Sequence, residues 1–415
     1  MNCVTNRRPR EYWLKKRLMS NDTKLSRPLR VGFITTGLYF DPAAAQNRAR
    51  FEALSRGSTG EIFGVVYDGS RTHEFAAYRA QVLSLPRWLG GYGFLRSSGR
   101  AVAYVCFVIG SAIHMRLTGQ RRFDLLVASD PFKSGELARL ASRILGIPYA
   151  VELNGNYDAA MALQDGATQA WFMRVKAKLA KALMPRVLRR AAAIKLLYEA
   201  QLGQFESPDL LRKTHVFHNL VPLDPFRPEP CEQPYLLLLG HPWLLKGADL
   251  AIRAFLQESE KFPEFHLHIV GYCPNPAEFE KLAGGHPRIH LHPAGVVHRE
   301  AIGLINRCFA LLLPSRTEGM GRVLLEAMAA AKPVVGAHVD GIPRVIRHEQ
   351  NGLLFESGNA QDLAVQLRRL MADTAFARSL GENGWADVHQ RLSPAAYEAA
   401  YLQFLAAAAG PLATG

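Results

Sequence analysis

The sequence predicts two α/β domains, each built on a doubly wound parallel sheet, that face one another across a cleft. Three observations favour this architecture. The 415 residues exceed what one hydrophobic core usually holds. Short apolar runs without strict polar alternation are separated by helical stretches, and a proline-rich break lies near the middle of the chain. Ligands of such sheets bind beyond the carboxyl ends of the strands, so we expect functional residues in the loops that follow them.

The first domain is expected to span residues 28–222, after a basic mobile tail, 1–27. Apolar runs predict its strands at Leu29–Thr36, Glu61–Tyr67, Phe123–Ser129, Pro148–Leu153, Ala192–Leu197 and Thr214–Phe217. The uncharged run Ala101–Ile113 is too short to span a bilayer, and we interpret it as a buried helix.

The proline-rich segment 223–232 predicts a stiff, extended linker. The strand pattern then restarts in a second domain, 233–394, with runs at Tyr235–Leu239, His266–Val270, Ile289–Pro293, Ala310–Pro314 and Pro333–Gly336. Residues 395–415 are expected to form a C-terminal helix and tail.

The net charge of +14 is concentrated in two segments. Residues 1–30 carry +7 and residues 166–198 carry +8, so the rest of the chain is close to neutral. Arg174, Lys178 and Lys181 share one side of the expected helix in the second segment. We interpret the two segments as binding an anionic membrane surface, while a solvated basic helix with ordinary packing is the alternative. Nucleic acid is not expected, because exposed aromatic residues do not interleave with the charges.

Several classes of chemistry have no motif in this chain. Its five cysteines are scattered without a C-x-x-C pair, and the basic N-terminus is not followed by the apolar stretch of a signal peptide. There is no D-x-D or H-x-x-x-H metal motif, no G-x-S-x-G elbow and no G-x-G-x-x-G after the first strand. We therefore expect a protein of the reducing cytoplasm that uses no metal, serine-hydrolase or nicotinamide chemistry.

The most informative stretch is Leu313–Ala329. A buried strand ends at Pro314 and a helix is expected to begin near Gly321, so free N–H groups at the helix start favour an anion such as a phosphate. Glu318 lies in the loop, and Glu326 falls on the polar side of the helix, where it can face a cleft. The alternative for Glu326 is a simple ion pair with Arg322 at i,i+4 on a solvated surface.

This stretch is similar to the E-x7-E signature of retaining GT-B glycosyltransferases of family 4, also called glycosyl transferases group 1. The resemblance continues in order through the second half, at Gly240–Leu250, Val270-Gly271, Ala294–Val296, Lys332–Val335 and Asn351–Leu354. It implies the GT-B fold, with an acceptor-side domain first, a donor domain second and a last helix that returns to the first domain. It also implies metal-independent transfer of a sugar from a nucleotide-diphosphate sugar.

The resemblance implies roles for individual residues. Glu326 would hold the ribose, and Glu318 would bind the donor sugar near the amides of Gly319, Met320 and Gly321. Lys246 would neutralise the leaving diphosphate, although a plain surface lysine is the alternative. Gly240, His241, Gly271 and Val296 complete the implied donor site, with His241 where the family usually has Arg or Lys.

The first half offers fewer candidates. By resemblance Gly37 would approach the donor phosphates, and Asn154 stands where the family commonly has a histidine in the cleft, so it joins Glu318 and Lys246 as a catalytic candidate. An ordinary turn explains each of these two residues equally well. Gln46, Asn47 and Arg48 are acceptor-side candidates by position, and Asp130 is expected to cap the next helix.

The chain is thus interpreted as a retaining glycosyltransferase that acts on a hydroxyl of a polysaccharide or lipid-linked intermediate, at the inner face of the cell membrane. Its expected partners are a nucleotide-sugar donor, a glycan or lipid-linked acceptor and the membrane. Two alternatives stay open: a nucleotide-sugar epimerase or hydrolase on the same fold, and a non-catalytic nucleotide-binding protein at the membrane.

Overall fold

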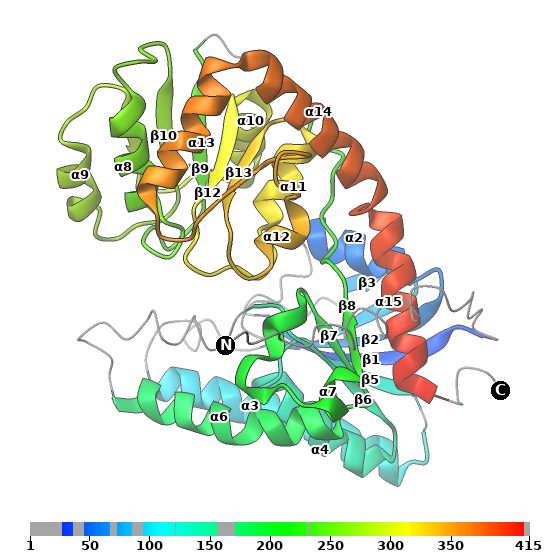
Figure 1. Cartoon of the computed structure of the whole chain (residues 1–415). Coiled ribbons are helices and arrows are strands. Elements are labelled where there is room, and N and C mark those ends of the chain that lie inside the picture. The colour runs from blue at the N-terminus through cyan, green and yellow to red at the C-terminus, as the bar shows by residue number, and fades with distance from the viewer. Residues whose placement is uncertain are drawn as a thin grey trace, which may run out of the picture.

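The computed structural model describes residues 27–35, 45–66, 73–84, 94–120, 122–155, 171–230 and 233–410. They form two α/β domains, stacked one above the other in Figure 1. The N-terminal sheet has the strand order β3-β4-β2-β1-β5-β6-β7-β8, and the C-terminal sheet has the order β11-β10-β9-β12-β13-β14. Neighbouring strands are parallel except for β3 and β4, which confirms the predicted class of two parallel-sheet domains.

The N-terminal sheet contains all six predicted strands and two further ones. Its strands are β1 (Leu29–Ile34), β2 (Ser58–Val66), β3 (His73–Phe75), β4 (Tyr78–Ser84), β5 (Leu125–Ala128), β6 (Tyr149–Glu152), β7 (Ala193–Leu196) and β8 (Thr214–Val216). Strands β3 and β4 were missed because β3 is the edge strand, β4 lies next to it, and both carry polar residues such as Glu74, Arg79 and Gln81. A continuous apolar run is the pattern of a strand covered on both faces, and an edge strand does not need it.

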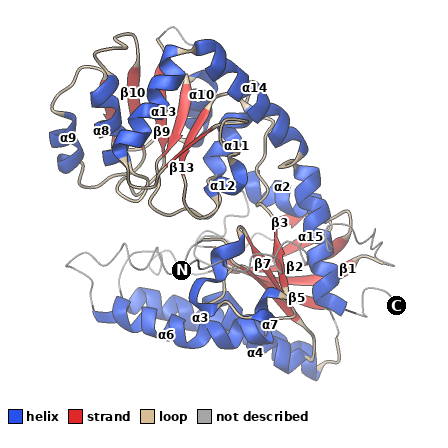
Figure 2. Cartoon of the chain, viewed as in Figure 1, coloured by secondary structure: helices blue, strands red, loops and turns tan. Residues whose placement is uncertain are grey.

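Helices cover both faces of this sheet (Figure 2). One face packs against α3 (Phe94–Leu117), α4 (Lys133–Leu145), α6 (Trp171–Arg190), the 3-10 helix η2 (Glu199–Phe205) and α7 (Pro208–Leu211). The other face packs against α2 (Ala45–Leu54) and α15 (Pro394–Ala409). Asp130 accepts hydrogen bonds from the amides of Phe132 and Lys133, 2.8 and 2.6 Å away, which confirms it as a capping residue before α4.

The expectation that Ala101–Ile113 forms a buried helix is only half right. The run lies in α3, where Tyr104, Val108 and Ala112 are buried against the sheet. Val102 and Ile113 are 63% and 45% exposed, because no described element covers the outer side of this helix. An apolar helix is fully buried only if neighbouring elements surround it, and the sequence of the helix does not determine which elements pack around it.

The C-terminal sheet contains the five predicted strands and one more. Its strands are β9 (Tyr235–Leu239), β10 (His266–Val270), β11 (Ile289–His292), β12 (Ala310–Leu313), β13 (Val334–Ala337) and β14 (Leu353–Phe355). Around it lie α8 (Ala248–Glu258), α9 (Ala277–Ala283), α10 (His298–Arg307), α11 (Arg322–Ala329), α12 (Ile342–Val345), α13 (Ala360–Ala372) and α14 (Thr374–Gln390). The three-residue β14 was missed because so short a run gives little periodic signal, although the equally short β8 was predicted.

Helix α15 leaves the C-terminal domain and packs on the N-terminal one, against α2 and strands β5 to β7, as the resemblance implied (Figure 1). Pro394 begins the helix and Ser393 caps it, accepting a hydrogen bond from the amide of Ala396. Tyr401 then packs edge-on against Phe217 and Phe404, and the rings of Phe217 and Phe404 meet at a tilt. The polypeptide therefore crosses between the domains twice.

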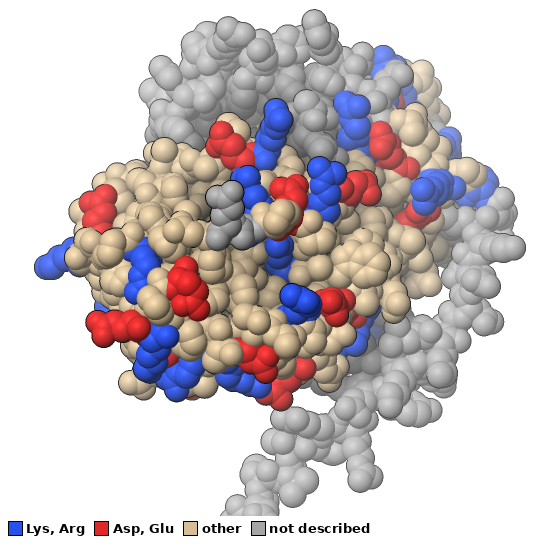
Figure 3. All heavy atoms as spheres, turned by 90° about the horizontal axis from the view of Figure 1, so that it is seen from above, with Lys and Arg blue, Asp and Glu red and all other residues tan. Residues whose placement is uncertain are grey.

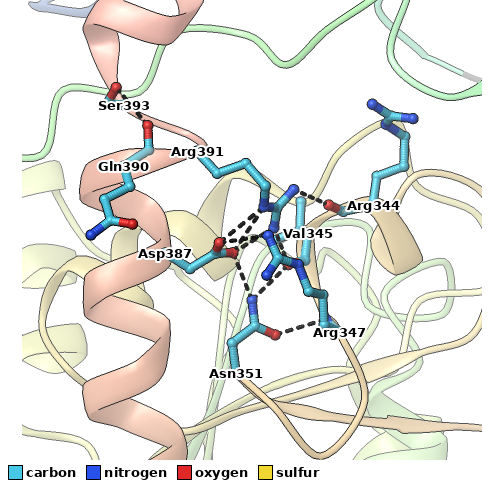
Figure 4. Close-up of polar contacts among 8 residues, drawn as sticks. All are labelled: Arg344, Val345, Arg347, Asn351, Asp387, Gln390, Arg391 and Ser393. Carbon is cyan, nitrogen blue, oxygen red and sulfur yellow. Dashed lines mark hydrogen bonds and ion pairs between the residues drawn. The ribbon is translucent and has the colours of Figure 1, made fainter. Parts of the chain in front are cut away.

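A polar cluster fixes the start of this crossing (Figure 4). Asp387, on α14, accepts hydrogen bonds from Arg391, from Arg347 at 3.0 Å and from Asn351 Nδ2 at 2.8 Å. Arg391 also donates to the carbonyl oxygen of Val345, 3.0 Å away. Burial acts to raise the pKa of Asp387, but the bonds and charge of Arg391 outweigh it and keep the pKa below its usual value. The end of α14 is thereby anchored to the α12 region.

Candidate active site

The loop between β12 and α11 depends on two glycines. Gly321 precedes the helix with a φ of 73°, a backbone conformation that other residues rarely adopt. A Cβ on Gly319 would lie 2.9 Å from the carbonyl oxygen of Asn154, in the opposite domain. At Gly319 the close neighbour in this structure is therefore the backbone of the other domain.

Asp340 holds this loop in place. Its Oδ2 accepts hydrogen bonds from the Glu318 amide at 3.0 Å and from Thr317 Oγ1 at 2.5 Å. Its Oδ1 accepts a bond from the hydroxyl of Tyr198, at the start of η2 in the N-terminal domain, at 3.1 Å. Sequence reasoning missed Asp340, and the only signal was an Asp-Gly pair after a strand, which usually marks a turn. One carboxylate therefore fixes the Glu318 loop and links it to the other domain.

The structure brings together the two predicted charged residues Lys246 and Glu318. Lys246 Nζ lies 2.5 Å from Glu318 Oε2, and the two side chains are only 19% and 15% exposed. Glu318 Oε1 also accepts a hydrogen bond from the Gly319 amide at 3.1 Å. A Cβ on Gly240 would approach the Lys246 side chain to 3.3 Å, so this glycine leaves room for the lysine stem. Lys246 is thus held in the loop region rather than extended into solvent.

Arg316 joins the two loops that carry these residues. Its guanidinium forms paired bonds of 2.7 and 2.8 Å with the carboxylate of Asp249, and its Nη1 donates to the carbonyl oxygen of Leu244 at 2.5 Å. A bidentate pair of this kind fixes orientation as well as distance. The sequence analysis did not single out Arg316 or Asp249, because residues 67 positions apart give no local signal.

Beside these loops lies an open cavity of about 690 Å³, within the size range of small-molecule sites. It contains four predicted donor-site residues: Gly240, His241, Gly271 and Val296. The rest of its lining is Leu239, Val270, Tyr272, Ala294, Gly295, Val297, His298, Glu300 and Ala301. The cavity lies beyond the carboxyl ends of β9 and β10 and at the start of α10, the place expected for ligands of a parallel sheet.

Glu326 lies on α11, partly buried. Burial raises its pKa above the usual value, while the charges of Arg322 and His298 act in the opposite direction. Of these two residues, His298 lines the cavity. Arg322 donates to Gln46 Oε1 of the N-terminal domain. Arg322 therefore bridges the domains. The alternative of a simple ion pair with Glu326 on a solvated surface does not describe the contacts of Arg322.

Asn154 is held by three hydrogen bonds. Its Nδ2 donates to the carbonyl oxygen of Ser129 at 3.1 Å and to Glu152 Oε2 at 3.2 Å. Its Oδ1 accepts a bond from Lys195 Nζ at 3.2 Å. Burial lowers the pKa of Lys195 to about 8, against the effect of the Glu152 charge. The Asn154 side chain is thus oriented by the buried charged groups of Glu152 and Lys195, unlike that of an asparagine in an ordinary turn.

Glu152 is the centre of this buried network. It pairs with Arg50 Nη2 at 2.6 Å and accepts a hydrogen bond from Tyr401 of α15. Burial acts to raise its pKa, but the charges of Arg50 and Lys195 keep the pKa below its usual value. Sequence reasoning missed Glu152 and Lys195 as functional candidates. The available signal was a charged residue inside each of two apolar strands, which is costly unless the charge is paired.

The remaining predicted residues have different positions. Met320 is buried at the domain boundary, where its Sδ accepts a hydrogen bond from the Asn219 amide at 3.2 Å. Gln46 donates to the carbonyl oxygen of Leu220 at 3.4 Å. Gly37 and residues 1–26 lie outside the described residues. In the described part of the chain, no group of three or more His, Cys, Asp or Glu side chains is placed to hold a metal ion.

Two partly buried histidines predict how stability depends on pH. Burial lowers the pKa of both His218 and His268 to about 4. An unfolded histidine binds its proton near pH 6.5, so the unfolded state binds more protons between about pH 6.5 and 4. We expect the free energy of unfolding, measured with urea, to fall as the pH drops through this range. His218→Phe and His268→Phe should each reduce that dependence, whereas exposed His389→Phe should not. If the pH dependence of the free energy of unfolding is unchanged in both the His218 and His268 variants, these two histidines are not its source.

The two sheets, the returning helix and the cavity at the strand ends define an α/β scaffold of the GT-B type. The family model described as glycosyl transferases group 1 matches residues 224–386. A second model, described as a glycosyl transferase 4-like domain, matches residues 43–219. The chain therefore belongs to the GT-B glycosyltransferases of group 1.

Individual relatives agree with this family. Alpha-D-kanosaminyltransferase of Streptomyces kanamyceticus is 26% identical over 262 residues, which are 59% of this chain and 66% of that protein. An uncharacterized glycosyltransferase of Methanocaldococcus jannaschii is 31% identical over 140 residues, 34% of this chain and 38% of that protein. These matches thus span between 38% and 66% of the length of the two relatives.

Solved structures share the whole fold. Sucrose-phosphate synthase from Thermosynechococcus elongatus superposes with a TM-score of 0.70 at 19% identity, over 91% of this chain and all of that one. HepE of Anabaena, solved in complex with UDP and glucose, gives a TM-score of 0.65 at 18% identity, over 91% of this chain and 99% of that one. At these identities the likeness concerns the fold.

Proposed function

We propose that this glycosyltransferase moves a sugar from a nucleotide-diphosphate sugar to a hydroxyl acceptor, with retention of anomeric configuration and without a metal ion. The observation that carries the proposal is the Lys246–Glu318 pair, held 2.5 Å apart beside the open cavity at the strand ends. A cation next to a glycine-bordered cavity is suited to a diphosphate, and a carboxylate beside it is suited to sugar hydroxyls.

In this proposal the nucleotide-sugar donor lies in the cavity. The base lies near Tyr272 and Val296, where Tyr272 is 62% exposed and offers an aromatic face. The ribose hydroxyls donate to Glu326, and the diphosphate binds Lys246 and the start of α11. Lys246 then exchanges its contact with Glu318 for the phosphate, which frees Glu318 to bind the sugar.

The proposed reaction is a substitution on one face of the sugar. The bond from the anomeric carbon to the diphosphate oxygen breaks, and a bond to the acceptor oxygen forms on the same face. The acceptor proton passes to the departing phosphate. Lys246 stabilises the charge that develops on the leaving group, which is the part a metal ion takes in other transferases. Asn154, oriented by Lys195 and Glu152, is assigned to the sugar side of this centre.

For the acceptor we propose a polysaccharide or lipid-linked intermediate on the cytoplasmic side of the membrane. The basic segments 1–30 and 166–198 support this placement by their charge. A further solved neighbour, WaaG, is described as involved in lipopolysaccharide biosynthesis and has a TM-score of 0.62 at 19% identity, over 89% of this chain and 98% of that one. Uridine is the first base to test, because HepE binds UDP.

A panel of nucleotide diphosphates and their sugars tests the donor class. A ligand that binds only the folded state raises the melting temperature, and at 100 times its dissociation constant it adds about 2.7 kcal/mol of stability. We expect one base to stabilise the protein as diphosphate and as diphosphate sugar, and pyrophosphate alone to have little effect. No shift with any base would contradict the proposal. Product analysis with and without acceptor separates transfer from epimerisation or hydrolysis, and binding without turnover would indicate a non-catalytic protein.

A further inference from the structure

Apolar side chains are exposed on one helical layer of the N-terminal domain. The layer consists of α3, α4 and α6, with α4 in contact with both others, and it lies on the side of the sheet away from the C-terminal domain (Figure 1). The described residues include eleven large hydrophobic side chains that are exposed, and six of them belong to this layer. These six are Val102, Val105, Ile113, Leu117, Leu140 and Leu179.

Four of the six form a single stripe along α3. At 3.6 residues per turn, positions 102, 105, 113 and 117 fall within about 120° of one another. Their exposed fractions run from 42% for Val105 to 81% for Leu117. The opposite side of the helix is fixed to the sheet, where the Tyr104 hydroxyl donates to the carbonyl oxygens of Thr35 and Phe63, at 2.6 and 2.9 Å. The apolar stripe therefore faces outward.

The same layer is strongly basic. Helices α3, α4 and α6 contain thirteen Lys and Arg residues in their sequences and one acid, Glu136, which pairs with Arg139. Among the described side chains, Lys178, Arg186, Arg189 and Arg190 of α6 are exposed. The opposite face of the molecule, seen from above in Figure 3, shows Lys and Arg mixed with Asp and Glu. Positive charge and exposed apolar surface thus coincide on one layer.

We propose that the α3–α4–α6 layer docks on the surface of a bilayer that contains anionic lipids. Its Lys and Arg side chains contact the head groups, and Val102, Ile113 and Leu117 enter the boundary with the acyl chains. None of the helices in the described ranges is long and apolar enough to cross a membrane, so the contact is with the surface. This inference rests on the proposed function, because docking on the bilayer would bring the enzyme to a lipid-linked acceptor.

Two other occupants fit the layer less well. A second copy of the chain would bring the same excess of positive charge against itself, which costs free energy when the charges are close. A nucleic acid would match the charge, but its bases stack on aromatic rings, and the six exposed side chains are aliphatic. An anionic bilayer matches both properties, because it offers negative head groups above an apolar interior.

Vesicle co-sedimentation of the full chain tests the proposal, with neutral and anionic phosphatidylglycerol vesicles at low and high salt. We expect a preference for anionic vesicles that declines as salt shortens the range of the charges. Arg186→Gln with Arg189→Gln should weaken binding at low salt by roughly tenfold or more, given about fivefold per basic residue. Val102→Ser with Leu117→Ser should instead remove the part of the binding that survives high salt.

A matched control carries equivalent changes on the C-terminal domain: Val365→Ser with Arg253→Gln and Arg378→Gln, all at exposed positions. It should bind vesicles like the unmodified protein. Equal binding of all variants, or no binding to anionic vesicles at low salt, would overturn the proposal. So would a change of oligomeric state in the Val102/Leu117 variant, or tighter binding to RNA than to vesicles. The vesicle assay contains no donor or acceptor, so a negative result in it does not contradict the proposed transfer reaction. A failure of nucleotide binding, in turn, does not contradict membrane docking by the α3–α4–α6 layer.

Discussion

Replacing Lys246 with alanine is expected to lower the rate of sugar transfer at least tenfold. In the proposed mechanism the lysine supplies the positive charge beside the leaving diphosphate, and groups that stabilise charge developing in the transition state have effects of this size or larger. The variant also removes the partner that lies 2.5 Å from Glu318 in this structure, and Glu318 keeps its hydrogen bond from the Gly319 amide. The measurement is kcat/KM with the donor identified by the nucleotide panel.

Three comparisons make the Lys246 result specific. Lys281→Ala removes an exposed lysine of the same domain and should leave the rate unchanged. Lys246→Arg keeps the charge and should retain more activity than the alanine variant. Activity should also persist in EDTA, because the proposed leaving-group stabilisation comes from the protein. Loss of activity on chelation, restored by magnesium, would overturn the metal-free mechanism.

Replacing Glu326 with alanine is expected to weaken nucleotide binding by about 1.5–3 kcal/mol, the range for hydrogen bonds to a charged group. This corresponds to a dissociation constant roughly ten- to hundredfold higher. The reason is the loss of the carboxylate that accepts bonds from the ribose in the proposed donor site. Calorimetric titration with the stabilising nucleotide diphosphate measures the change directly.

The Glu326 experiment needs a folded variant and a carboxylate control. Glu280→Ala removes an exposed carboxylate from α9 and should bind nucleotide normally. Circular dichroism and the unfolding transition establish that Glu326→Ala retains its fold. An unchanged dissociation constant in a folded Glu326→Ala variant would reject the ribose role, and would leave Lys246 and the cavity as the supports of the donor site.

The two sheets could be predicted from sequence because central parallel strands have a local signature. Segments such as Tyr235–Leu239 and Ala310–Leu313 are buried on both faces, so each is a continuous apolar run that needs no knowledge of its neighbours. The loop from Pro314 to Gly321 was recognisable for a similar reason. A strand end, two glycines and a helix start occur within one short stretch, and they constrain the backbone locally.

The tertiary structure alone decided which distant residues meet. The Lys246–Glu318 pair joins positions 72 residues apart, and the contact between Tyr198 and Asp340 joins positions 142 residues apart. Such contacts depend on how the helices and strands pack together, and a local sequence pattern does not predict this packing. The same holds for α3, whose apolar sequence fits a buried helix equally well. Its outer stripe is exposed because no described element packs on it, and exposure is a property of neighbours rather than of the helix itself.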